Sequence, residues 1–214
     1  MRDAEAFVRA NTVLSQGALV PEIKLWLASE ITPIWQATED WLRETGTAPP
    51  FWAFAWPGSI AMARHMLDHP EIARGRRVLD FAAGCGLAAI AAATLGAARV
   101  EAAEIDPLAI AAIHLNAALN GVAVEANCAD VVGAACRWDL ILCGDVCYEA
   151  PMTGHILPWL RRMAAIAEVW IADPGRAYLP REGLELFAEF TVPTSPELED
   201  RPERMVRLSR LQPG

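Results

Sequence analysis

The sequence predicts an α/β fold built on a mainly parallel sheet, and three observations carry this prediction. From Arg76 onwards, short apolar runs alternate with segments of helical character. One such run, Arg77–Phe81, ends in a glycine-rich turn that opens a helix. The chain has 214 residues, of which 54% are hydrophobic, enough to bury one substantial core. We therefore expect a single structural unit with right-handed crossovers rather than two separate domains.

The first part of the chain, residues 1–47, is expected to form a helical extension to this unit. Pro21 is expected to begin a short helix whose apolar face contains Ile23, Leu25, Trp26 and Leu27. Thr32 and Pro33 predict the start of a second helix that runs to Gly46. The main unit is then expected over residues 48–214.

The main unit begins with a break at Ala48-Pro49-Pro50, an aromatic segment at Phe51–Gly58, and a helix to about Asp68. Beyond it, strands are expected at 77–81, 99–105, 122–126, 138–143 and 168–172, and helices at 87–95, 107–120 and 158–167. Asp106-Pro107 supplies the cap and first turn of the middle helix. The last two strands, 184–192 and 204–211, have no full helix between them and should pair antiparallel at one edge.

Composition and charge exclude several classes of function. A net charge of −9 argues against a nucleic-acid binder that uses a broad basic face. The most apolar stretch, residues 87–98, is shorter than the roughly 18 residues that a membrane span needs. The 5 cysteines form no CxxC pair, so we expect reduced thiols and no metal site; His65 and His69 are interpreted as a solvated helix face. The start, Met1–Glu5, resembles neither a signal nor a transit sequence, which predicts a cytoplasmic protein.

The glycine loop marks the expected ligand site. Asp80 closes a strand, and Gly84 and Gly86 follow it at the start of a helix, where glycine lets the backbone turn sharply and approach a ligand. The same run fits the degenerate dinucleotide pattern, with Glu104 as the ribose acid. The loop alone therefore leaves an NAD-dependent oxidoreductase open.

Three further features favour S-adenosylmethionine over a dinucleotide. Asp80 would repel a pyrophosphate and attract an ammonium group. Asp130 follows the third strand, where it can accept a hydrogen bond from an adenine amino group. The chain is also too short for a separate dehydrogenase substrate domain.

The loop, with Glu104, Asp130 and the segment around Asp145, resembles the class I methyltransferases over about residues 50–211. This resemblance implies a Rossmann-like sheet of seven strands with an antiparallel last strand. It also implies that Gly84 and Gly86 contact the methionine end of S-adenosylmethionine, Glu104 holds both ribose hydroxyls, and Asp130 meets adenine. Ala82 departs from the pattern, because many members carry glycine there.

A second resemblance points to the substrate. Asp145 and Tyr148 form an Asp-x-x-Tyr segment similar to that of protein-lysine methyltransferases. Together with the aromatic segment 51–58 and Asp173-Pro174-Gly175-Arg176, it resembles the lysine methyltransferases of the electron transfer flavoprotein β subunit. This implies that Trp56 and Gly144 touch the cofactor. A ribosomal protein is the alternative substrate, since related enzymes with similar glycine loops modify ribosomal proteins.

The resemblance implies catalytic roles for Asp145 and Tyr148, and the chemistry agrees with it. A lysine with a pKa of about 10.4 arrives protonated, and a carboxylate attracts and orients its ammonium group while raising its pKa. Asp145 is thus interpreted as a positioning carboxylate, and Tyr148 as a hydrogen-bond partner or entry residue. The alternative for both is a simple helix-capping role. Asp173 and Arg176 are open between a substrate-side role and a local salt bridge.

Overall fold

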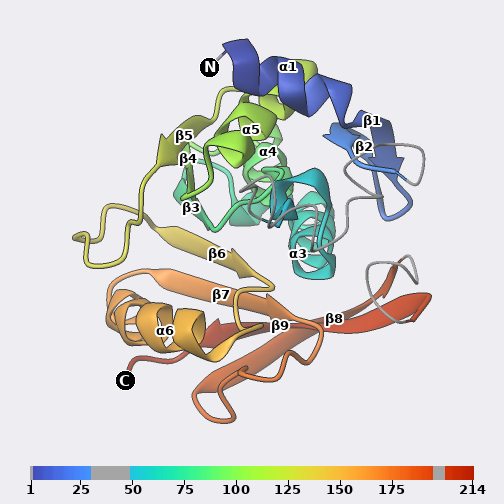
Figure 1. Cartoon of the computed structure of the whole chain (residues 1–214). Coiled ribbons are helices and arrows are strands. Elements are labelled where there is room, and N and C mark those ends of the chain that lie inside the picture. Colours follow the sequence, from blue (N-terminus) through green and yellow to red (C-terminus); the bar gives the residue numbers. More distant parts are fainter. Residues whose placement is uncertain (1, 30–48, 195–200) are drawn as a thin grey trace.

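The computed structural model describes residues 2–29, 49–194 and 201–214 (Figure 1). Its central feature is a seven-stranded sheet in the order β5-β4-β3-β6-β7-β9-β8. The five parallel strands are β3 (Arg77–Phe81), β4 (Arg99–Glu104), β5 (Glu125–Cys128), β6 (Leu140–Gly144) and β7 (Glu168–Asp173). The last two, β8 (Leu184–Pro193) and β9 (Glu203–Leu211), pair antiparallel, and β9 also runs antiparallel to β7. The predicted sheet and its antiparallel last strand are confirmed.

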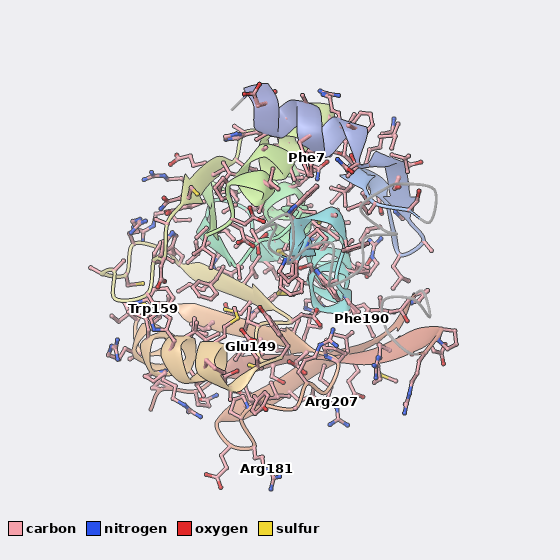
Figure 2. The ribbon with its side chains drawn as sticks, viewed as in Figure 1. Phe7, Glu149, Trp159, Arg181, Phe190 and Arg207 are labelled. Carbon is pink, nitrogen blue, oxygen red and sulfur yellow. The ribbon has the colours of Figure 1, made fainter. Side chains whose placement is uncertain are left out.

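Helices cover both faces of this sheet, which explains why its central strands are almost continuously apolar. On one face lie α3 (Pro57–Asp68), α4 (Leu87–Thr94) and α5 (Pro107–Leu119), and on the other lies α6 (Ala150–Ala164). Side chains fill the space between the layers (Figure 2), and Trp159 of α6 is buried there against Phe81 and Trp138. Within the described residues, no helix is long and apolar enough to cross a membrane.

The N-terminal part is only partly helical. A helix, α1 (Arg2–Ala10), begins the chain, but β1 (Val13–Gly17) and β2 (Val20–Leu27) then form an antiparallel hairpin. The helix expected from Pro21 is therefore wrong. Ile23 and Leu25 are buried and Lys24 between them is exposed, which is a period of two. A run this short cannot be distinguished from a helical face by sequence alone. The second expected helix, residues 32–46, lies outside the described residues.

The hairpin lies on α5 and shares its core with the main unit. Asn116 Oδ1 accepts a hydrogen bond from Trp26 N at 2.7 Å, and Asn120 Oδ1 accepts one from Lys24 N at 3.0 Å. Ile23 and Leu25 belong to the same cluster of buried residues as α3 and α4. The N-terminal strands thus extend the packed core rather than forming a separate layer.

The starts of β5 and α6 differ most from those predicted. β5 begins at Glu125 rather than at residue 122, because the turn that ends α5 extends to Val122, whose N–H donates to Ala117 O. Helix α6 begins at Ala150, and Pro158 lies inside it. A proline is common in the first turn of a helix but can also lie in the interior, which the prediction did not allow for. The cap at Asp106 is confirmed: its Oδ1 accepts from Leu108 N at 2.8 Å.

Candidate functional site

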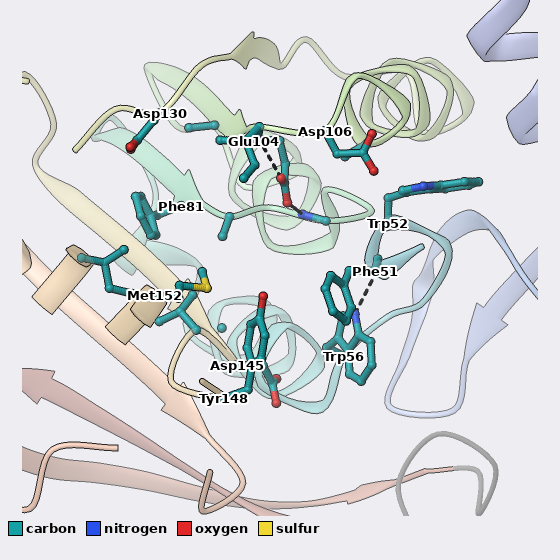
Figure 3. Close-up of a pocket in the computed structure, with 18 of the residues that line it drawn as sticks. Phe51, Trp52, Trp56, Phe81, Glu104, Asp106, Asp130, Asp145, Tyr148 and Met152 are labelled. Carbon is teal, nitrogen blue, oxygen red and sulfur yellow. Dashed lines mark hydrogen bonds between the residues drawn. The ribbon is translucent and has the colours of Figure 1, made fainter. Parts of the chain in front are cut away.

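A cavity of about 750 Å³ opens at the carboxyl ends of the parallel strands, beside the ends of β3 and β6 (Figure 3). The strand order reverses between these two strands, which is where open α/β sheets bind ligands. Most of the residues predicted for the site line this cavity: Trp56, Gly84, Glu104, Asp130, Gly144, Asp145 and Tyr148. Asp80 and Gly86 lie behind it and are not among the lining residues.

The glycine loop shapes the floor of the cavity. Gly84 has a φ of 54° and Gly86 a φ of 80°, both in the region that glycine adopts readily. A Cβ at Gly86 would lie 3.1 Å from Ile113 of α5, so a side chain there would press on the packed helix. Gly84 N donates to Glu104 Oε1 at 2.8 Å, which ties the loop to the end of β4.

Asp80 supports the loop from beneath. Its carboxyl group is buried, and Oδ2 accepts from Ala89 N in the first turn of α4 at 2.9 Å. Burial raises the pKa of Asp80 to about 8, which favours the neutral form of this group. Asp80 therefore caps α4 and does not line the cavity, so it would affect a ligand indirectly, through the position of the loop.

Two further acids line the cavity at the ends of β4 and β5. Glu104 Oε2 accepts from Ile105 N at 3.0 Å, and burial raises the pKa of this carboxyl above its usual value. Asp130 Oδ1 accepts from Val132 N at 2.9 Å, and Oδ2 contacts His155 Nε2 at 2.7 Å. Burial acts to raise the pKa of Asp130, but these two hydrogen bonds outweigh it and lower the pKa overall. Each carboxylate still has lone pairs that can accept from a ligand.

Aromatic side chains form the opposite side of the cavity. Trp56 Nε1 donates to Phe51 O at 2.9 Å, and the Phe51 ring packs against both Trp56 and Tyr148 with centroid distances of 5.8 and 5.5 Å. Figure 3 shows the Tyr148 hydroxyl directed into the space between these rings and Met152. Gly144 lies where α3 meets β6, and a Cβ there would come within 2.9 Å of Ser59 Oγ.

Asp145 stands at the centre of a small polar network. It has a φ of 54°, and its side chain is only 8% exposed. Oδ2 accepts from Gly58 N at 2.5 Å, while Oδ1 accepts from Arg176 Nε and Nη2 at 3.1 and 2.7 Å. Burial raises the pKa of Asp145 to about 6, and Arg176 offsets part of that rise. Of the two roles left open for Arg176, the structure therefore contains the local salt bridge, and it lies in the cavity lining.

Sequence reasoning missed His155, Met152 and Phe51 as lining residues. His155 and Met152 belong to the first turns of α6, which the prediction began too late. Ala150-Pro151 carries the usual signal for a helix start and could have placed both residues correctly. Phe51 was read as part of an aromatic segment without a separate role.

Comparison with known proteins agrees with this architecture. The family model described as "Ribosomal protein L11 methyltransferase (PrmA)" matches residues 61–144. The solved structure of magnesium protoporphyrin IX methyltransferase from Synechocystis PCC 6803 with bound SAH superposes with a TM-score of 0.52 at 16% identity, covering 71% of this chain and 81% of that one. At that identity, the likeness concerns the fold alone.

Two curated relatives extend the similarity over most of the chain. The electron transfer flavoprotein beta subunit lysine methyltransferase of Danio rerio is 36% identical over 207 residues, which cover 92% of this chain and 79% of the relative. The protein of the same name from Xenopus laevis is 40% identical over 177 residues, covering 80% of this chain and 70% of the relative. The chain therefore belongs to the family of electron transfer flavoprotein beta subunit lysine methyltransferases.

Proposed function

We propose that this enzyme uses S-adenosylmethionine to methylate lysine side chains of the electron transfer flavoprotein β subunit. The observation that carries the proposal is the relationship, over most of the chain, to lysine methyltransferases of that name, combined with a cavity lined by both Asp145 and Tyr148. The family relationship supports the substrate, and the cavity supports the chemistry.

The residues of the cavity fit S-adenosylmethionine. Its volume of about 750 Å³ lies in the usual range for small-molecule sites. The Glu104 carboxylate is held by two backbone N–H groups and can accept from a ribose diol. Asp130 is available to an adenine amino group, and the glycine loop offers the close backbone approach that an amino-acid tail requires. In this assignment Gly84, Trp56 and Gly144 lie along the path of the ligand, while Asp80 and Gly86 shape the loop.

When bound, the cofactor supplies a methyl group on a sulfonium, a carbon open to in-line attack. The protein's task is to align an uncharged amine with that carbon and to keep water out, and alignment is the larger contribution. Phe51, Trp56 and Tyr148 form an aromatic passage suited to the alkyl chain of a lysine. In this proposal, Asp145 and the Tyr148 hydroxyl orient the nitrogen. Both residues line the cavity, and Figure 3 shows the hydroxyl directed into it and the Asp145 carboxylate toward the other end of the Tyr148 ring.

A ribosomal protein is the second candidate substrate, because the matching family model is that of a ribosomal protein methyltransferase. That match ends at Gly144, before the Asp145–Tyr148 segment. The segment that faces the substrate thus lies outside the match, which favours the flavoprotein over the ribosome.

The proposal is tested by radiolabelled methyl transfer to a bacterial lysate and to purified electron transfer flavoprotein, followed by mass spectrometry of the labelled proteins. We expect methyl groups on lysines of the β subunit. Label confined to ribosomal proteins would favour the second candidate. Label confined to glutamine, N-terminal amines or small molecules would contradict lysine methylation, and cofactor binding without any transfer would indicate a non-enzymatic regulator.

Glu104→Ala is expected to weaken binding of S-adenosylhomocysteine by roughly 1.5–3 kcal/mol, about 10- to 150-fold, because two hydrogen bonds to a charged group are lost. The change also removes the acceptor that ties Gly84 to β4. Calorimetric titration measures the effect. Glu71→Ala, at a side chain that is 73% exposed and outside the cavity lining, is the matched control and should bind normally. Unchanged affinity in Glu104→Ala would remove this residue from the cofactor site.

A further inference from the structure

Arg176 forms a largely buried salt bridge with Asp145. Its Nε and Nη2 atoms both donate to Asp145 Oδ1, and the two side chains are only 20% and 8% exposed. The guanidinium carbon also lies 5.9 Å from the centre of the Trp56 ring, on the aromatic side of the cavity. Arg176 thus links the loop after β7 to the loop after β6 in the lining of the cavity.

The backbone around Arg176 is held in place by Asp173 at the end of β7. Asp173 Oδ1 accepts from Gly175 N and Arg176 N, both at 2.6 Å. This double hydrogen bond fixes the turn from which the guanidinium reaches Asp145. The position of the cation is therefore built into the fold.

Among the described residues near Asp145, Arg176 is the main positive charge. Helix α3 contributes the N–H of Gly58, and β7 contributes the carboxylate of Asp173, which disfavours the charged form of Asp145. The loop that carries Asp145 also contains Cys147 and Tyr148. Burial raises the pKa of the Cys147 thiol to about 12. The pKa of Tyr148 is raised by burial and by the charges of Glu149 and Glu104. Cys147 and Tyr148 are both neutral near pH 8, so the local charge that the described residues supply comes from Asp145, Arg176 and Asp173.

This matters because the amine must be uncharged to react. The lysine ammonium first loses one proton to water; the nitrogen lone pair then forms the N–C bond as the C–S bond breaks, its electron pair staying on sulfur. An unpaired carboxylate beside the nitrogen would hold the proton on it. Resting on the proposed lysine methylation, we propose that Arg176 is a positioning residue that neutralises Asp145, so that the carboxylate orients the amine without keeping it protonated.

The proposal predicts that two single variants shift the midpoint of the kcat–pH profile in opposite directions. Arg176→Gln leaves the Asp145 carboxylate unbalanced, so the enzyme–substrate complex gains a proton and the midpoint of the kcat profile should move up by about one pH unit. Near pH 8, kcat then falls about tenfold and recovers as pH rises. Asp145→Asn removes the negative charge beside the amine while the positive charge of Arg176 remains, so the midpoint should move down.

The test measures kcat against pH from 6.5 to 10 with purified flavoprotein β subunit as substrate. The variants are Arg176→Gln, Arg176→Lys and the double variant Asp145→Asn/Arg176→Gln. The lysine variant keeps the charge, so it should lose rate at every pH with little change in midpoint. The double variant removes both charges and should return the midpoint to within a few tenths of the wild-type value.

Two measurements separate failure of this inference from failure of the proposed function. If the wild-type enzyme does not methylate lysine, the function itself is wrong. If it does, and Arg176→Gln loses rate equally at all pH values, Arg176 has only a structural role and the inference is overturned. Binding of S-adenosylhomocysteine to each variant verifies the fold, and Arg99→Gln, an exposed arginine at the opposite end of the strands, should match the wild type.

Discussion

Asp145→Asn should lower kcat/KM for the protein substrate by about 100-fold, on the order expected when a reacting group loses its alignment. The lysine arrives as an ammonium ion, and the variant lacks the Asp145 charge that orients it while the positive charge of Arg176 remains. Binding of S-adenosylhomocysteine should stay close to normal, because the cofactor contacts proposed for Glu104 and Asp130 lie on other strands.

Asparagine is a suitable replacement at this position. It has the shape of aspartate, tolerates the left-handed backbone with a φ of 54°, and its amide oxygen can still accept from Gly58 N. Its NH2 group then replaces the acceptor that Arg176 uses in the wild type. The variant therefore changes the charge with little change in packing. Transfer is measured with radiolabelled cofactor, and binding is measured by calorimetry.

Asp139→Asn is the matched control. Asp139 precedes β6 at the end away from the cavity and pairs with Arg77 on the surface, so transfer should persist. Full activity in Asp145→Asn would mean that Asp145 only stabilises its loop and takes no part in methyl transfer. Loss of cofactor binding together with activity would mean that Asp145 maintains the cavity as a whole.

The location of the site follows from the sequence, because parallel strands end at one edge of their sheet. Glu104, Asp130 and Gly144 each end or follow a predicted strand, and βα alternation alone brings them together. Their proximity can be predicted without knowing any side-chain contact. The order of elements also predicts the two antiparallel strands at the edge of the sheet, because no full helix lies between them in the sequence.

Contacts that depend on loop geometry could not be predicted in this way. Arg176 and Asp145 lie on two separate loops, and their pairing depends on a left-handed residue and on a turn held by Asp173. The burial of Asp80 likewise depends on how tightly α4 closes over β3. The hydrophobic pattern of the sequence predicts where a strand ends. The direction of a side chain at that end depends on the residues that pack around it, which the pattern does not show.

Gly58→Ala should destabilise the protein by roughly 3–5 kcal/mol. A Cβ at this position would lie 2.5 Å from Asp145 Oδ2 and 2.6 Å from Ala172 O, and the second of these atoms belongs to the backbone of a central strand. Overpacking costs about 1–3 kcal/mol, and displacing the buried hydrogen bond from Gly58 N to a carboxylate adds about 1.5–3 kcal/mol. Helix α3 would have to lift from the sheet to accommodate the methyl group.

Gly154→Ala provides the comparison within the same chain. Gly154 lies inside α6, and a Cβ there would meet nothing within 4 Å. That variant should gain about 0.5–1 kcal/mol, because alanine favours the helix over glycine. Urea unfolding of both variants measures the difference. If Gly58→Ala unfolds at the wild-type urea concentration, the start of α3 has room to move, and the close contact between Gly58 and Asp145 does not hold the site together.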